Sequence, residues 1–381
     1  MCARMSASNP VGGFTAVADV GDDRETALEV LAARLRLATL QVVWRQWQAL
    51  GAEAASRSVQ GRRPLQALID PEALLLVSLV LMSDECGLAE LLYDWGGKNS
   101  ALLNVQRTRK LATAYPARAR RHLMNQLTGF AIVARDKGND ARWRSVAEQG
   151  EHGDCRFPNE LARKPHVATW SMRHGGASVR SGAHATMVGQ DAPGVVPGNT
   201  PLTRVCLVED AALTLRLRQA FGVSVKADVL AYLLARVDEA AAVREISEAV
   251  ACSPATAYAA AEELSAARLV RSLDGQPSSY RAPHESWKQL LGFEDRPPRW
   301  AGWSQRYLFL TALLHWADTT SRWPVKSSAS VARDRDLVER YRSWFVPGPA
   351  VLSIASPHRE DWRGILRRAM HDLTGWMNEM A

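Results

Sequence analysis

The chain has 381 residues, of which 47% are hydrophobic and 23% charged, with a formal net charge of +7 and a pI near 9.3. This length allows two or three domains that each bury a core. The longest apolar run, residues 73–82, is shorter than the roughly 20 residues that cross a bilayer, so we expect no membrane segment. The basic excess permits attraction to polyanions without identifying one.

The N-terminus and the cysteines indicate a compartment. Residues 1–21 lack the continuous apolar core of a signal peptide, and we expect a disordered tail there. The five cysteines are odd in number and far apart, without a C-x-x-C pair, which favours reduced thiols over a disulfide framework or a zinc knuckle. We therefore expect a cytoplasmic protein with no cofactor and no bound metal.

A helical N-terminal domain is predicted over residues 22–148. Apolar residues at three- and four-residue spacing predict an amphipathic helix from about residue 28, ended by Gly51. Asp70 as N-cap and Pro71 at the first helical position mark the start of a second, buried helix. After it, Gly96 and Gly97 are expected to break the helical pattern before two further helices.

Six basic residues lie within fifteen positions in those two helices. Residues 24–148 as a whole contain 18 basic and 12 acidic residues, and these six account for much of the difference. They would suit a nucleic-acid backbone, but they would equally suit an ordinary solvated helix face, and both interpretations stay open. This basic group consists of Arg107, Arg109, Lys110, Arg118, Arg120 and Arg121.

Residues 149–203 change in character. They hold eight glycines, five prolines and four of the nine histidines, with no sustained apolar period. Such a composition buries too little apolar surface to offset the entropy of ordering, which predicts a flexible linker between two folded halves.

A compact domain is predicted next, over residues 204–284, beginning with a helix at 226–236. A short helix at 243–251, a break at residues 252–254, a helix at 254–268 and two brief strands around Asp274 and Gly275 follow. Ser253 is expected to cap the second of these helices, with Pro254 at its first position. The small core between the helices is predicted from Ile246, Ala249, Val250, Ala257, Ala261 and Leu264.

The phrase Ser253-Pro254-Ala255-Thr256, with residues 264–271 (LSAARLVR), resembles bacterial winged helix-turn-helix regulators of the MarR and ArsR kind. The resemblance covers residues 226–283 only, and Arg268 stands where that family usually has glycine. It implies that the 254–268 helix enters the major groove of DNA and that the wing lies against the backbone or minor groove. The contacts predicted on this basis are Arg244, Ser253, Ala255, Thr256, Tyr258, Ala259, Arg271, Gln276, Ser278 and Arg281.

The charge of this domain argues in the other direction. Residues 222–284 hold six basic and eight acidic residues, and the outward face of the 254–268 helix has no Arg, Lys, Asn or Gln. Because duplex affinity depends on neutralising phosphates, the domain would need local arginines or the basic group to bind DNA well. A winged domain kept for protein contact is the alternative.

Residues 285–381 are predicted to form a tryptophan-rich helical region. Eight of the thirteen tryptophans lie between Trp287 and Trp376, in helices expected at 300–319, 334–345 and 358–380. This concentration fits an ordinary core as well as a ligand pocket or dimer interface.

No catalytic pattern accompanies these elements. Residues 96–100 (GGKNS) fail the phosphate-loop pattern, because Leu92 and Asn99 occupy positions that need Gly and Ser or Thr. His315 and Asp318 are expected to be a buried or capping pair. The ligand-type residues of the glycine-rich segment are interpreted as scattered linker side chains: His152, Cys155, His166, His174 and His184.

We therefore expect a mainly α protein with a helical N-terminal domain, a linker, a winged domain and a helical C-terminal extension. The leading hypothesis is a non-enzymatic, homodimeric regulator of transcription that binds double-stranded DNA. The alternative is an adaptor or inhibitor whose winged domain binds a protein partner.

Overall fold

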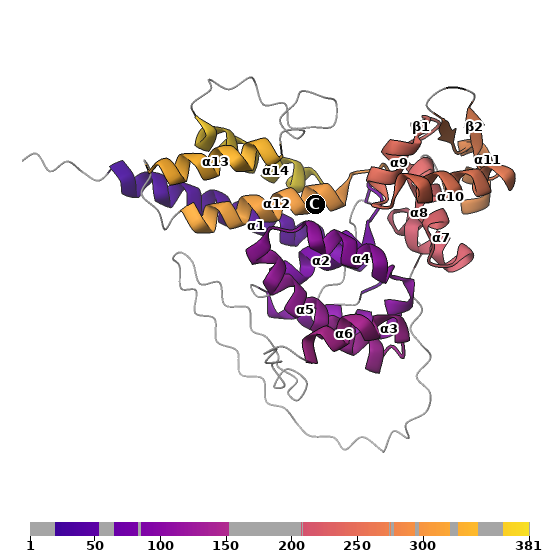
Figure 1. The fold of residues 1–381 in the computed structure, drawn as a ribbon, viewed down its shortest axis with the longest axis horizontal. Helices are drawn as coiled ribbons and strands as arrows, with labels where there is room; N and C mark the ends of the chain where they lie inside the picture. The colour runs from indigo at the N-terminus through magenta and orange to yellow at the C-terminus, as the bar shows by residue number, and fades with distance from the viewer. Residues whose placement is uncertain are drawn as a thin grey trace, which may run out of the picture. The chain divides into compact units, whose positions relative to one another are not determined.

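The computed structural model describes residues 20–52, 65–82, 85–151, 207, 209–273, 275, 278–293, 297–320, 327–341 and 361–380 (Figure 1). Within these residues the protein has fourteen α-helices and one small antiparallel sheet of three strands, so the predicted mainly helical class with a small β element is confirmed. Among the described helices, none has both the length and the apolar character required to cross a membrane.

Two compact units divide the described chain. The first takes the residues up to Thr39 and those from Ala312 to Glu379. The second takes the residues from Leu40 to Thr311 and Met380. Residues predicted as the N-terminal domain and as the winged domain thus fall largely within the second unit.

The first unit is a bundle of helix segments. It contains the beginning of α1 (Val20–Ala49), the end of α12 (Trp303–Thr320), α13 (Ser328–Arg340) and α14 (Trp362–Met380). The buried Asp334 of α13 accepts hydrogen bonds from Trp316 (2.7 Å) and Arg363 (3.1 Å), which joins three of these helices. Asp318 is exposed and lies 3.6 Å from Arg36, so it is not buried as one form of the expected pair with His315 requires.

The first helices of the second unit begin and end where their sequence signals stand. α1 ends at Ala49, and Gly51 follows with a φ of +77°, a left-handed conformation that glycine adopts without strain. The Asp70 side chain accepts from the Ala73 backbone N–H (3.1 Å) and caps α2 (Pro71–Leu81), as predicted. α2 is buried along almost its whole length.

The predicted helix break at the glycine pair is wrong. α3 (Cys86–Asn99) continues through Gly96 and Gly97. A Cβ at Gly96 would lie 2.3 Å from the Phe130 ring, so this glycine permits close packing of α3 on the helix that carries Phe130 instead of ending α3. The remaining elements here are η1 (Ser100–Leu102), α4 (Val105–Ala114), α5 (Ala117–Asp136), η2 (Ala141–Trp143) and α6 (Arg144–Glu151).

The second half of the same unit carries the sheet. Its elements are η3 (Asp210–Ala212), α7 (Leu213–Phe221), α8 (Val225–Ala235), β1 (Ala241–Ala242), α9 (Val243–Ala249), α10 (Pro254–Ala266), β2 (Arg271–Leu273), β3 (Ser279–Arg281) and α11 (His284–Leu291). The strand order is β1-β3-β2, and both pairings are antiparallel. Tyr280 of β3 is therefore flanked by Ala241 on one side and Ser272 on the other.

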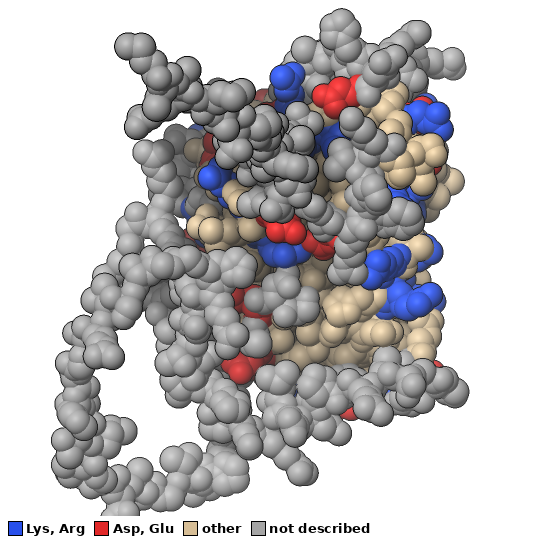
Figure 2. All heavy atoms as spheres, turned by 90° about the vertical axis from the view of Figure 1, so that its left-hand side faces the viewer, with Lys and Arg blue, Asp and Glu red and all other residues tan. Residues whose placement is uncertain are grey.

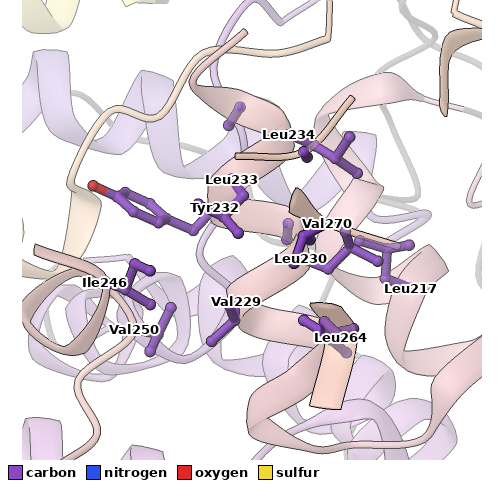
Figure 3. Packing of buried hydrophobic residues seen from close by; sticks show 14 of the residues in the cluster. Leu217, Val229, Leu230, Tyr232, Leu233, Leu234, Ile246, Val250, Leu264 and Val270 are labelled. Atoms are coloured by element: carbon purple, nitrogen blue, oxygen red, sulfur yellow. The ribbon is translucent and has the colours of Figure 1, made fainter. Parts of the chain in front are cut away.

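One hydrophobic cluster holds these elements together (Figure 3). Residues from α7 to α11 contribute to it, and Figure 3 shows Leu230 of α8 beside Val270 and Ile246 of α9 beside Val250. All six residues predicted as the small core between the helices are buried. Because each fully buried aliphatic side chain contributes about 1.5–3 kcal/mol, this cluster orients α10 firmly on α8 and α9.

Several sequence predictions fall on residues that the structure does not describe. The described chain starts within the predicted tail, at Val20, and α6 extends into the predicted linker as far as Glu151. Residues 152–206, which include the rest of that linker and its histidines, lie outside the described residues, as do residues 342–360.

Candidate nucleic-acid interface

The start of α10 is fixed by its capping residue. The Ser253 hydroxyl oxygen accepts from the Thr256 backbone N–H at 3.1 Å and lies 2.7 Å from the Thr256 hydroxyl. Both side chains are exposed. The predicted cap is confirmed, and the first turn of α10 presents two ordered hydroxyl groups to the surroundings.

The outward face of α10 carries the residues predicted for it. Ala255, Thr256, Tyr258 and Ala259 are exposed, with Tyr258 at 48%, whereas Leu264 is buried in the cluster. These four residues give the face an exposed surface with two hydroxyl groups but no cation. The contacts that this face could make with base edges are therefore limited to hydrogen bonds from hydroxyl groups and apolar contacts.

Acidic residues on α10 are engaged with neighbouring elements. Glu262 accepts a hydrogen bond of 2.5 Å from the Tyr280 hydroxyl of β3, which ties the strand to the helix. Glu263 forms an ion pair with Lys226 of α8. Arg244 of α9 is 87% exposed and pairs with Glu248 at 3.0 Å. Exposed pairs of this kind contribute little stability, so an approaching phosphate would displace them at small cost.

The β2–β3 hairpin places two arginines opposite each other. Arg271 and Arg281 are cross-strand partners in the antiparallel register. Like charges in directly opposite positions destabilise a strand pair, so the hairpin keeps a local positive charge at an electrostatic cost. Arg271 and Ser278 are exposed and Arg281 is half-buried, while Gln276 lies outside the described residues.

Arg107, predicted as a member of the basic surface group, is instead buried. Its guanidinium binds both carboxylate oxygens of Asp70 (2.5 and 2.6 Å), one oxygen of Glu72 (2.6 Å) and the Val250 backbone carbonyl (3.0 Å). Every charge-assisted contact of this side chain is thus internal, and Arg107 is not accessible to a nucleic-acid backbone. The apolar pattern of α4 did not reveal this, because a buried arginine leaves the same sequence signal as an exposed one.

A second buried arginine completes an ionic cluster. Arg218 of α7 binds both oxygens of Glu72 (2.5 and 2.9 Å), Asp228 of α8 (2.8 Å) and the Leu102 carbonyl (3.0 Å). The ionic cluster, as we name it, consists of Asp70, Glu72, Arg107, Arg218 and Asp228, all buried. Through it, α2 and α4 are bonded to α7, α8 and the end of α9.

Charges inside the ionic cluster shift its pKa values. Burial alone would raise the pKa of Glu72, but Arg218 and Arg107 outweigh it and lower this pKa to about 2. Burial raises the pKa of Asp228, and the negative charge of Glu72 raises it further. The neighbouring cavity, lined by four members of the cluster and by Trp300, has about 10 Å³, which suits one water molecule and excludes a small-molecule effector.

The other five members of the basic group remain near the surface. Lys110, Arg118, Arg120 and Arg121 are exposed and Arg109 is half-buried. On the face drawn in Figure 2, Lys and Arg side chains lie interspersed with Asp and Glu. Along the chain the charges separate more clearly, because residues 95–135 contain eight Lys and Arg and no Asp or Glu.

The weaker motifs of the sequence gain no support as sites. Residues 96–100 belong to α3 and η1, so they do not form a phosphate-binding loop. Among the described residues, no group of three or more His, Cys, Asp or Glu side chains is placed to hold a metal ion, and the linker histidines lie outside those residues.

No family model, curated protein or solved structure matches the chain. The function is therefore argued from the geometry and charge of the residues above.

Proposed function

We propose that the protein is a DNA-binding regulator of transcription, and that α8, β1, α9, α10, β2 and β3 form a winged helix-turn-helix. In this proposal the exposed N-terminal turn of α10 enters the major groove, and the β2–β3 hairpin is the wing. A homodimer in the cytoplasm that binds two half-sites completes the proposal.

The observation that carries the proposal is the division of α10 into two faces. Ala257, Ala261 and Leu264 are buried against α8 and α9, whereas the first turn, fixed by Ser253, is exposed. A recognition helix requires this arrangement, because its N-terminal residues contact base edges while its other side holds the helix on the domain.

The contacts follow from the exposed groups. Thr256 and Tyr258 would donate to phosphates or base edges, and Ala255 and Ala259 would contact thymine methyl groups. Arg271, with Arg281 opposite it in the hairpin, would bind phosphate. The anion would also relieve the repulsion between the two arginines.

The test measures binding of the full chain to a fluorescent random-sequence duplex at low and moderate salt. We expect binding that weakens with salt, and a loss of about tenfold or more in affinity for the Thr256→Ala, Arg271→Ala double variant, since it removes one cation and one hydroxyl group that would contact phosphates. Lys98→Ala, which removes an exposed lysine paired with Asp94, is the control and should bind like the wild type. Wild-type affinity in the double variant would contradict the role of α10 and the wing.

A second candidate function, an adaptor that binds a protein partner, is favoured by the acidic balance of residues 222–284 and by the pairing of Lys226 and Arg244 with glutamates. In that case the full chain fails to bind duplex even at low salt, and one protein partner co-purifies with it in stoichiometric amount.

A further inference from the structure

Exposed cations at the end of α4 and the start of α5 have no acidic partner among the described residues. Three other exposed cations of the second unit, Lys98, Lys226 and Arg244, each have an acidic partner within 4 Å. Lys110 and Arg121 form no ion pair with any acidic residue that the structure describes, and residues 95–135 contain no acid of their own. A positive surface of this kind attracts a polyanion.

The ionic cluster positions α4 beside the start of α10. The Arg107 Nε donates to the Val250 carbonyl at 3.0 Å, at the end of α9 and three residues before the cap of α10. Lys110 lies almost one helical turn after Arg107 on the exposed side of α4. Burial raises the pKa of the Cys252 thiol and the charge of Lys110 opposes that rise, which agrees with the proximity of Lys110 to the turn.

The corner between α4 and α5 continues this positive surface. Arg120 Nη1 donates to the Thr113 carbonyl at 2.9 Å, and the Thr113 hydroxyl donates to the Lys110 carbonyl at 2.7 Å, so the start of α5 is bonded to the last turn of α4. Arg118 and Arg121 are exposed in the first turns of α5. Cations at a helix N-terminus oppose the helix dipole, so helix stability does not account for them.

We propose that Lys110, Arg118 and Arg121, the corner cations, bind the phosphate backbone of the same duplex whose major groove receives α10. This inference rests on the proposed function. Because the N-terminal turn of a recognition helix faces DNA, a residue beside the α9–α10 turn faces the flanking phosphates. The corner cations thereby supply the electrostatic affinity that α10 and the wing lack.

Duplex DNA fits this surface better than a single strand does. Single-strand binding needs exposed aromatic side chains on which bases stack, and Tyr115, the aromatic residue of this corner, is buried. The corner cations would contact phosphates alone, so their contribution should be the same for every DNA sequence.

The experiment compares full-length variants by the dependence of duplex affinity on salt. The patch variant, Lys110→Ala, Arg118→Ala and Arg121→Ala, should lower the slope of log K against log salt by about 3, at about 0.9 per phosphate contact, and weaken all sequences equally. The control variant, Lys98→Ala, Lys137→Ala and Arg335→Ala, removes the same charge from exposed positions elsewhere and should retain the wild-type slope. Thermal unfolding checks that all variants fold.

The possible results distinguish a failure of this inference from a failure of the proposed function. If the patch variant keeps the wild-type slope while the Thr256→Ala, Arg271→Ala variant loses affinity, the corner cations do not bind DNA and the proposed function stands. If only the patch variant loses affinity, the recognition role of α10 is wrong. If the patch variant and the control variant lower the slope of log K against log salt equally, net charge alone explains the effect and the inference is overturned. A wild type that binds no duplex, or prefers single strands, overturns both proposals.

Discussion

In the proposed function, the α4–α5 region and the α9–β3 region divide between them what a DNA-binding surface needs. The α9–β3 region has an exposed, capped helix with a two-stranded hairpin behind it, but residues 222–284 are slightly acidic. The α4–α5 region has exposed cations without an ion pair among the described residues, Lys110 and Arg121, and consists of two helices with no hairpin between them. In the proposed function, sequence recognition and electrostatic affinity therefore lie in different elements, which the protein has to hold together.

The ionic cluster is what holds them together. Two guanidinium groups and three carboxylates are buried between α2, α4, α7 and α8, and their hydrogen bonds also reach backbone carbonyls at Leu102 and Val250. A buried ionic group contributes little net stability against a hydrophobic replacement, but removal of one partner is costly because the other charges stay buried. The cluster therefore fixes a particular mutual placement of these helices.

Removal of Arg218 should have the largest effect. Arg218→Ala leaves Glu72 and Asp228 without one of their cations inside the protein, and we expect the free energy of unfolding to fall by about 3–5 kcal/mol. Urea unfolding measures the change. Lys98→Ala removes an exposed lysine from an ion pair within α3 and should cost less than about 0.5 kcal/mol. A loss below about 1 kcal/mol for Arg218→Ala would show that the cluster does not hold the two regions.

Acid should lower the free energy of unfolding through the same ionic cluster, by a smaller amount than the removal of Arg218. The pKa of Glu72 falls from 4.5 to about 2 on folding, so its contribution is complete above about pH 5 and is lost as the pH falls from there toward 2. The loss amounts to about 3 kcal/mol, partly offset by Asp228, whose raised pKa favours the folded state in acid.

Unfolding in urea between pH 7 and pH 3 measures this dependence. Glu72→Gln should flatten the fall in stability across that range, although it lowers stability at pH 7. Glu90→Gln, at an exposed position of α3, is the matched control and should preserve the wild-type fall. An unchanged pH profile in Glu72→Gln would mean that other carboxylates cause the acid sensitivity.

The sequence predicted those features that depend on neighbouring residues. The cap of α10 by Ser253, the cap of α2 by Asp70 and the burial of Leu264 follow from local hydrogen bonding and helical spacing, and the structure confirms all three. The ionic cluster joins residues as far apart as Glu72 and Arg218, and no periodicity reports a pairing over that distance.

Errors of prediction arose where one residue type serves two purposes. Gly96 was expected to break a helix, but its missing side chain makes room for Phe130. Arg107 was expected on the surface, but it has buried carboxylate partners that permit its burial. In both cases the partner that decides the role comes from a different helix, which local sequence cannot identify.

The smallest expected effect concerns the C-terminal end of α10. Arg268 follows the C-cap Ala267 with a φ of +60°, a left-handed conformation that costs a residue with a side chain about 1 kcal/mol. The Leu269 backbone N–H donates to the Leu264 carbonyl (2.9 Å) and closes the helix end in the manner that usually employs glycine. Arg268→Gly should therefore raise the free energy of unfolding by up to about 1 kcal/mol.

Ala267→Gly makes the control for this substitution, because Ala267 has a φ of −76° and lies at the preceding position. Glycine there relieves no strain and loses more entropy on folding, so stability should fall by roughly 0.5–1 kcal/mol. Opposite signs for the two neighbouring substitutions in thermal unfolding would show that the left-handed residue is at 268. A decrease in stability for Arg268→Gly would mean that the arginine side chain makes a contact that stabilises the fold by more than the strain costs. The positive charge of Arg268 would then have to be counted in the comparison of charge between the α4–α5 and α9–β3 regions.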